Sequence, residues 1–165
     1  MLPLSFTTLG CPSWSLREIV ENAAEMGFDA VDFRGLQDTL DVTENPAFNE
    51  NLSETKHLFA DHNVAISGIA TSARFGVVDE AELQANMDEA RRNLALAAEL
   101  GAPVLRVYGG RVPDGYTVDS IMPTIVENLR AAGDEAEKFG VTLALETHDD
   151  WTDSSVFARL MREVD

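Results

Sequence analysis

A short β-like run followed by a helical pattern recurs five times along this 165-residue chain. The β-like runs begin near residues 4, 29, 64, 103 and 141, so that successive runs start 25, 35, 39 and 38 residues apart. Parallel strands need long crossover connections, and a strand alternating with a helix at this period predicts a parallel sheet with right-handed crossovers. We therefore expect an α/β fold of five βα units in a single domain that covers residues 1–165.

The individual elements follow from hydrophobic periodicity and from start and stop signals. Strands are expected at residues 4–8, 29–34, 64–69, 103–108 and 141–146. Helices are expected at residues 15–26, 53–61, 79–100, 118–139 and 152–164. The first helix has a capping box from Ser15 to Glu18, and Gly27 and Gly101 stand where the first and third helices should end.

One face of each expected strand carries small or polar side chains, since alternate residues of a strand point to opposite sides of a sheet. These residues are Ser5 and Thr7; Ala30, Asp32 and Arg34; Ala65 and Ser67; Val104, Arg106 and Tyr108; and Thr142, Ala144, Glu146 and His148. An open sheet with helices on both faces would instead show continuous Val, Ile and Leu. A barrel with a polar interior fits this pattern better.

A complete (β/α)8 barrel, or TIM barrel, needs eight βα units and about 250 residues. Five units alone would leave both edges of the sheet unpaired and the interior open to water. We therefore expect a partial TIM barrel, the N-terminal five-eighths of the fold, truncated after the fifth unit. Further sequence, a partner chain or a homo-oligomer would complete it.

The charge balance limits the classes of partner. The chain has 29 acidic and 12 basic side chains and a formal charge of −17, which repels nucleic acid and anionic membranes. No apolar run approaches the roughly 20 residues that span a bilayer, and the N-terminus lacks a signal-peptide pattern. The single cysteine, Cys11, cannot form an internal disulfide. These features favour a cytoplasmic protein.

Glu146 ends the fifth expected strand on its less apolar face, and His148 follows on the same side. In parallel α/β folds, chemistry gathers where the carboxyl ends of strands open into loops. A carboxylate at such a place can give one hard oxygen ligand to a divalent ion, and a neighbouring histidine can bind substrate or support the site. The alternative is a helix-cap or salt-bridge role for the acidic turn at residues 146–150.

Asp32, Arg34 and Arg106 are also expected to face the interior, where a charge costs free energy unless it is paired or bound to a ligand. An ion pair of Asp32 with Arg106 is one explanation. The two arginines would equally suit the hydroxyls or the phosphate of a sugar. Gly109-Gly110 could cradle a phosphate, although paired glycines in a βα turn more often serve the geometry of the turn.

Four groups of residues form landmarks in sequence order. They are Thr8-Leu9-Gly10-Cys11-Pro12 with Trp14-Ser15-Leu16; Gly27-Phe28-Asp29-Ala30-Val31-Asp32-Phe33-Arg34; Leu100-Gly101-Ala102-Pro103 with Arg106-Val107-Tyr108-Gly109-Gly110; and Leu145-Glu146-Thr147-His148-Asp149. Together they resemble the xylose isomerase-like TIM barrels, a family of sugar phosphate isomerases and epimerases. The likeness covers essentially the whole chain, and its specificity lies in the order and spacing of these motifs.

The resemblance implies a divalent metal ion, usually Mn²⁺, Mg²⁺, Co²⁺ or Zn²⁺, at the mouth of the barrel. Its ligands in the family are a Glu after strand five, an Asp after strand six, a His after strand seven and a Glu after strand eight. Only the first has a counterpart here, Glu146, and the others would follow Asp165. We therefore expect this chain alone to be inactive.

For the complete protein, the resemblance implies isomerisation or epimerisation of a sugar or sugar phosphate by proton transfer next to a carbonyl group. Glu146 would be both a metal ligand and an acid/base group, and His148 would orient the hydroxyls of the substrate. Arg34, Arg106 and Tyr108 would also bind substrate, the arginines by neutralising negative charge.

Three other functions stay open. An inosose dehydratase-type lyase shares the fold and the metal, and a non-catalytic half-barrel completed by a partner chain needs no chemistry at all. An endonuclease IV-like nuclease is similar in fold but uses several metal-ligating histidines at strand ends. Thr71, Ser72 and Tyr108 stand at such places here, and the surface is acidic. The nuclease is therefore the poorest fit.

Overall fold

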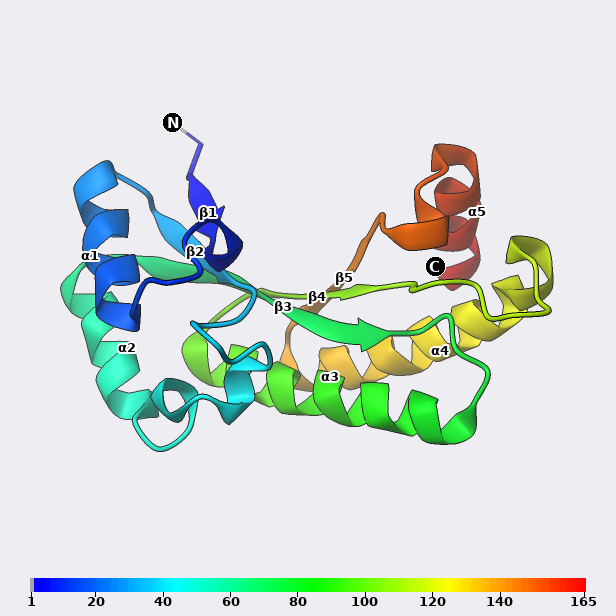
Figure 1. Cartoon of the computed structure of the whole chain (residues 1–165), viewed down its shortest axis with the longest axis horizontal. Helices are drawn as coiled ribbons and strands as arrows, with labels where there is room; N and C mark the ends of the chain where they lie inside the picture. Colours follow the sequence, from blue (N-terminus) through cyan, green and yellow to red (C-terminus); the bar gives the residue numbers. More distant parts are fainter. Residues whose placement is uncertain (1) are drawn as a thin grey trace.

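Strands and helices alternate along residues 2–165, the part of the chain that this computed structural model describes (Figure 1). The elements are β1 (Ser5–Thr7), α1 (Leu16–Met26), β2 (Ala30–Phe33), α2 (Leu52–Asp61), β3 (Ala65–Arg74), α3 (Glu80–Leu100), β4 (Val104–Tyr108), α4 (Val118–Phe139), β5 (Thr142–Glu146) and α5 (Ser154–Val164). Each of the expected strands and helices is present. Within residues 2–165, no helix is long and apolar enough to cross a membrane.

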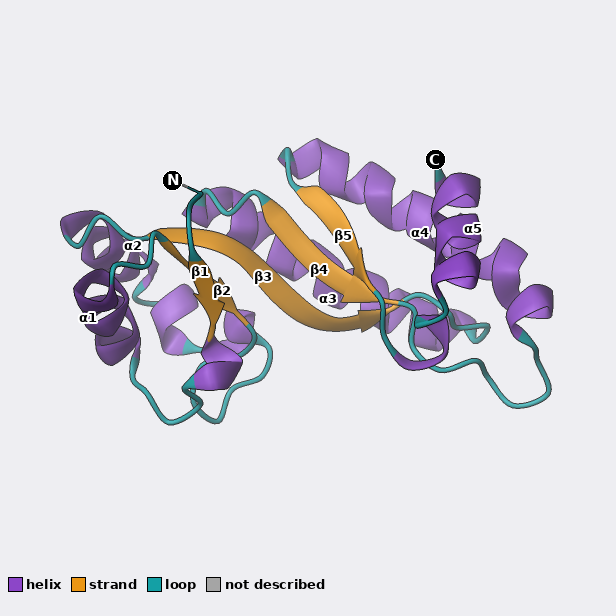
Figure 2. Ribbon diagram, turned by 90° about the horizontal axis from the view of Figure 1, so that it is seen from above, coloured by secondary structure: helices purple, strands orange, loops and turns teal. Residues whose placement is uncertain are grey.

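The five strands form one parallel sheet in the order β1-β2-β3-β4-β5. Each strand thus pairs with its neighbour in sequence, with a helix between them, as in a TIM barrel. Figure 2 shows α3 and α4 beneath the sheet and no helix across the opposite face in this part of the chain. The expectation of a partial TIM barrel is therefore confirmed, and a sheet enclosed by helices on both sides is excluded.

The two faces of the sheet differ as the alternation of the sequence predicted. Val31, Phe33, Leu105 and Val107 are fully buried on the face toward the helices. The opposite face carries polar groups, and near its base the hydroxyls of β1 and β3 meet, with 2.7 Å between Ser5 Oγ and Ser67 Oγ. The apolar core thus lies between sheet and helices.

The ends of the helices follow their local sequence signals. At the start of α1, the side chain of Ser15 accepts from the backbone N–H of Glu18, and the Glu18 carboxylate accepts from the backbone N–H of Ser15. Gly27 ends α1 with φ +77°, a left-handed conformation that glycine adopts without steric cost.

β3 departs most from its expected bounds, because it continues to Arg74 rather than stopping at residue 69. Val31 pairs with Ile66, but the next residue of β2, Asp32, pairs with Gly68, so that β3 contains one extra residue. A Cβ atom on Gly68 would lie 3.0 Å from Asp32 Oδ1 and 3.2 Å from the carbonyl oxygen of Val104. The glycine therefore lets the Asp32 side chain sit against the bulge.

Gly109 and Gly110, which follow β4, pack against Trp151 from the loop after β5. Trp151 is fully buried, and its Nε1 donates to the carbonyl oxygen of Gly110 at 2.9 Å. A Cβ atom on Gly109 would overlap the indole ring, and Gly110 has φ +77°. The structure therefore accounts for this glycine pair by packing and backbone geometry.

We expect Gly109→Ala to destabilise the protein by about 2 kcal/mol or more, because the added methyl group must displace Trp151 from a filled site. Gly133→Ala is the matched control. Its Cβ would meet no atom within 4 Å in the middle of α4, and alanine there should stabilise by up to about 1 kcal/mol. Urea unfolding of the full-length protein measures both changes. Equal stability of Gly109→Ala and wild type would contradict this packing.

Candidate functional site

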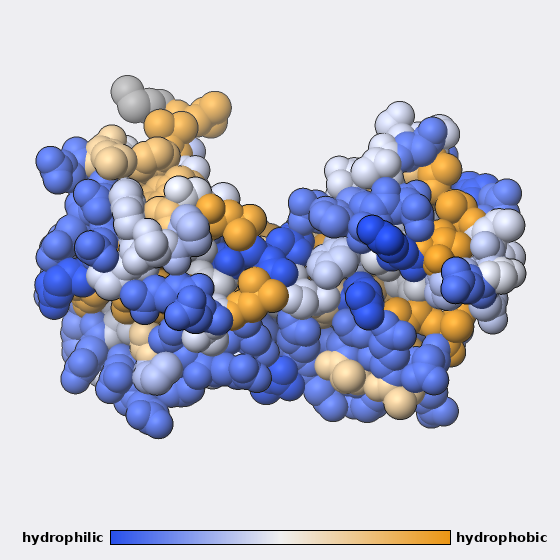
Figure 3. All heavy atoms as spheres, viewed as in Figure 1, coloured by the Kyte–Doolittle hydropathy of each residue, from blue (hydrophilic) through white to orange (hydrophobic). Residues whose placement is uncertain are grey.

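The polar face of the sheet gathers ionisable and aromatic side chains toward the carboxyl ends of the strands. Arg34 follows β2, Arg106 and Tyr108 belong to β4, Glu146 ends β5, and His148 lies two residues further on. Figure 3 shows a hollow above the sheet, between the two raised ends of the molecule, with strongly hydrophilic residues at its floor. This is the open interior of the partial barrel.

Glu146 and Arg106 form an ion pair on this face between β4 and β5, with 2.9 Å between Glu146 Oε2 and Arg106 Nε. The parallel register places them close together, because Tyr108 of β4 pairs with Glu146 of β5. Nη1 of Arg106 donates to the carbonyl oxygen of Thr71 at 2.8 Å, and its guanidinium lies 5.6 Å from the centre of the Tyr108 ring. Arg106 thus holds Glu146 from a position that neighbouring strands define.

The exposure of the two side chains differs in a way that matters for binding. The Arg106 side chain is 22% exposed, whereas the Glu146 side chain is 42% exposed. The arginine therefore serves as the fixed partner, and the carboxylate remains accessible to a ligand in the hollow.

His148 lies beside Tyr108, with 5.3 Å between the ring centres, and its Nδ1 is 3.0 Å from Asp149 Oδ2. Asp149 also faces Arg111 from the loop after β4, at 3.8 Å. Tyr108, Arg111, His148 and Asp149 line a groove of about 560 Å³ together with Arg74, Gly76, Val77, Glu82, Val112, Pro113 and Asp114. An imidazole and a phenol thus meet at the side of this groove.

The acidic residues after β5 have different roles in the structure. Asp153 caps α5, since its Oδ1 accepts from the backbone N–H groups of Ser155 and Val156. Asp150 instead accepts from the backbone N–H of Val112 at 2.7 Å, and Asp149 pairs with His148. Of these three residues, Asp153 caps the last helix, whereas Asp149 and Asp150 hold the loops around the groove.

Asp32 lies on the same face but does not form the expected ion pair with Arg106, whose partner is Glu146. Burial raises the pKa of the Asp32 carboxyl, and the negative charge of Glu146 acts in the same direction. A hydrogen bond from the Thr7 side chain and the positive charge of Arg106 partly oppose this shift. The net effect favours the protonated form of Asp32.

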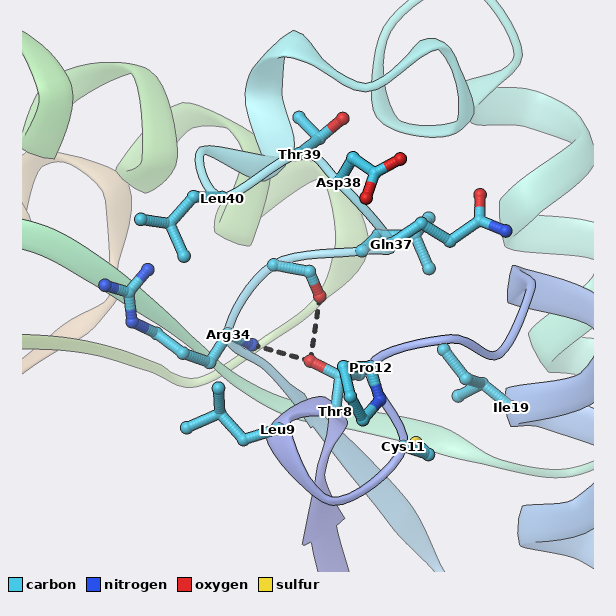
Figure 4. A pocket seen from close by; sticks show the side chains of 12 residues that line it. Thr8, Leu9, Cys11, Pro12, Ile19, Arg34, Gln37, Asp38, Thr39 and Leu40 are labelled. Atoms are coloured by element: carbon cyan, nitrogen blue, oxygen red, sulfur yellow. Dashed lines mark hydrogen bonds between the residues drawn. The ribbon is translucent and has the colours of Figure 1, made fainter.

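Arg34 lies where the loops after β1 and β2 meet (Figure 4). Its backbone N–H donates to Thr8 Oγ1 at 2.9 Å, and the same hydroxyl donates to the carbonyl oxygen of Gly35 at 2.8 Å. Nη2 of Arg34 donates to Ser72 Oγ of β3 at 3.0 Å. Thr8 is buried and thus fixes the backbone from which the Arg34 side chain projects. A cavity of about 170 Å³ adjoins these residues.

The structure therefore brings Arg34, Arg106, Tyr108, Glu146 and His148, all expected from the sequence, to one face. Arg106, Tyr108 and Glu146 each affect the electrostatics of Arg34. Sequence reasoning missed the contributions of four residues: Thr8, Ser72, Arg111 and Trp151. Each of the four acts through a contact between segments that are far apart in the sequence, for which local patterns give no signal.

The described residues do not by themselves form a metal site. Glu146 offers an accessible carboxylate at a strand end, which suits a divalent cation. Within residues 2–165, no group of three or more His, Cys, Asp or Glu side chains is arranged to hold a metal ion. A metal bound at Glu146 would thus need additional ligands.

Comparison with known proteins gives a family, a curated relative and solved structures of similar fold. A sequence model described as xylose isomerase-like TIM barrel matches residues 20–165. A 2-oxo-tetronate isomerase of Pectobacterium atrosepticum is 32% identical over 130 residues, which cover 75% of this chain and 46% of that protein. The chain thus spans about half the length of the curated relative that it matches.

Solved structures share the fold over nearly the whole chain. A probable 3-DHS dehydratase from Bacillus anthracis matches with a TM-score of 0.80 and 18% sequence identity. The match covers 99% of this chain and 60% of the dehydratase chain. A xylose isomerase-like TIM barrel protein from Mycobacterium smegmatis, in complex with magnesium, matches with a TM-score of 0.71 and 19% sequence identity. The match covers 99% of this chain and 61% of the Mycobacterium smegmatis chain. Members of this fold thus include a protein with a bound divalent ion.

The raised pKa of Asp32 predicts how stability depends on pH. The native state holds this proton more tightly than the unfolded chain, whose carboxyl titrates near the ordinary value of 3.8. Stability contributed by the protonated form is therefore lost as pH rises from about 3.8 through the native pKa. We expect Asp32→Asn not to show this loss, because the amide does not ionise. The free energy of unfolding of the variant should therefore rise relative to that of wild type across this pH range and then reach a constant difference.

Urea unfolding at a series of pH values measures this difference. Asp61→Asn at the exposed end of α2 is the control, because it changes the net charge equally at a site without burial. A constant difference between Asp32→Asn and wild type across the range would contradict the electrostatic assignment.

Proposed function

Because the chain belongs to the xylose isomerase-like TIM barrel family, we propose that it forms the first five βα units of a metal-dependent isomerase or epimerase domain. The substrate is a sugar or sugar phosphate, and the reaction is proton transfer next to its carbonyl group. The observation that carries this proposal is the position of Glu146, an accessible carboxylate at the end of β5 held by Arg106. The isomerase from Pectobacterium atrosepticum supports the reaction type.

Glu146 would hold the metal ion together with ligands from further βα units. A divalent ion of the Mn²⁺, Mg²⁺, Co²⁺ or Zn²⁺ type, when bound, polarises the carbonyl and the neighbouring hydroxyl of the substrate. The fit rests on the carboxylate itself, a hard oxygen donor at an open strand end. The magnesium complex of the Mycobacterium smegmatis protein supports a metal in this fold.

The side chains of this chain divide the remaining tasks. The Glu146 carboxylate accepts the proton from the carbon next to the carbonyl group, and Arg106 fixes the orientation of that carboxylate. Tyr108 and His148, whose rings are adjacent, bind and orient the hydroxyl groups of the substrate. Arg34 neutralises negative charge at the other side of the hollow.

A lyase of the inosose dehydratase type is the second candidate. It would begin with the same removal of a proton next to a carbonyl group, followed by loss of a hydroxyl group from the adjacent carbon. The similar fold of the probable dehydratase from Bacillus anthracis favours keeping this candidate. Product analysis after incubation of the full-length protein with ketoses and inososes separates isomers from dehydrated products.

We expect Glu146→Gln in the full-length protein to reduce kcat/KM by about 10³-fold or more, because the amide neither accepts the proton nor binds a cation as a carboxylate does. Bound metal, measured by elemental analysis after dialysis, should fall as well. Glu137→Gln is the control, since it makes the same substitution on the exposed surface of α4.

Normal turnover and normal metal content in Glu146→Gln would disprove the role of this residue. If turnover falls while bound metal stays unchanged, then the acid/base role survives and the ligand role fails. Unchanged thermal unfolding of the variant separates both results from a loss of structure.

A further inference from the structure

Arg34 carries the least compensated positive charge on the polar face of the sheet. Its neighbour Arg106 pairs with Glu146, whereas Arg34 forms no ion pair with a carboxylate of residues 2–165. Nη2 of Arg34 donates to the neutral hydroxyl of Ser72, and Nη1 is buried without a hydrogen-bond partner among the same residues. A buried donor without an acceptor is costly, and more so when it is charged.

The surroundings of Arg34 increase this cost. Burial is the main cause that lowers the pKa of the guanidinium, and the positive charge of Arg106 adds to it. Tyr108, Glu89 and Glu146 oppose the shift in the pKa of Arg34 without reversing it. An arginine stays protonated in proteins, so the unfavourable free energy remains until a negative group approaches.

The setting of the guanidinium suits a planar anion. Figure 4 shows it directed toward the side of Leu9 and Leu40, away from the loop that contains Gln37, while the carboxylate of Asp38 points elsewhere. Leu9 is 60% and Leu40 54% exposed, so either side chain can turn outward without disturbing the core. Apolar neighbours also exclude water, which strengthens a contact between opposite charges.

We propose that Arg34, held by Ser72, binds an anionic terminal group of the substrate, so that the substrate is a sugar acid or a sugar phosphate rather than a neutral sugar. This inference rests on the proposed function for the identity of the ligand as a sugar. The arginine fork matches both a carboxylate and a phosphate. Arg34 reaches Ser72 of β3, and Glu146 pairs with Arg106 of the adjacent β4, so the two groups lie over neighbouring strands on the same face of the sheet.

Calorimetric binding to the full-length protein tests this subsite without any need for turnover. The probes are D-erythronate, inorganic phosphate and erythritol, the neutral counterpart of the acid. We expect D-erythronate or phosphate to bind at least about tenfold more tightly than erythritol, and Arg34→Gln to remove that preference. Whichever anion binds more tightly identifies the terminal group as carboxylate or phosphate.

Two further variants test whether the preference for anions depends on the guanidinium of Arg34. Arg34→Lys keeps the charge but not the planar fork, and should retain part of the preference. Arg17→Gln removes the same charge from the exposed surface of α1 and should retain all of it. Wild-type protein that binds neither anion more tightly than erythritol overturns the proposal, as does an unchanged preference in a folded Arg34→Gln. If Arg34→Gln does not fold, Ser72→Ala must weaken anion binding or the proposal fails.

The failure of this inference is distinguishable from the failure of the proposed function. If Arg34-dependent anion binding occurs but no ketose, sugar acid or sugar phosphate is isomerised, then the subsite stands and the isomerase assignment falls. If neutral ketoses are isomerised with the same kcat/KM as their anionic counterparts, then the isomerase stands and the subsite falls.

Discussion

Burial of a single face of the parallel sheet is the constraint on which the rest of this structure depends. Val31, Phe33 and Leu105 pack against the helices, so the alternate residues of the same strands must point into the interior of the barrel. Charges placed there need partners, and the pair of Arg106 with Glu146 meets this need for two of them. The chemistry of the site thus follows from the same alternation that builds the core.

Much of the fold could be predicted from local sequence, because each βα unit carries its own signals. The expected bounds of α4 agree with the observed Val118–Phe139, because the helical period fills this range and the cap residues Thr117 and Gly140 directly adjoin it. Alternation alone placed Arg106, Glu146 and His148 on the polar side. Such predictions succeed where the deciding interactions lie within about four residues of one another.

The remainder depended on contacts between distant segments. The extra residue of β3 precedes Gly68, which accommodates Asp32 of the neighbouring strand, and residues 64–69 alone do not show that Asp32 is the neighbour. The sequence also did not predict which carboxylate pairs with Arg106, because Asp32 and Glu146 both lie on the same face. The register of β4 and β5 brings Glu146 close to Arg106. Trp151 escaped notice because its partner, Gly110, is 41 residues away.

The contact of Trp151 with Gly109 and Gly110 has a mechanical consequence. It connects the turn after β4 to the turn after β5. The hydrogen bond from the backbone N–H of Val112 to Asp150 is a second connection between the same turns. We therefore expect these two turns to move together. Any adjustment to a bound molecule would then fall to the other wall of the hollow, where Leu9 and Leu40 are more than half exposed.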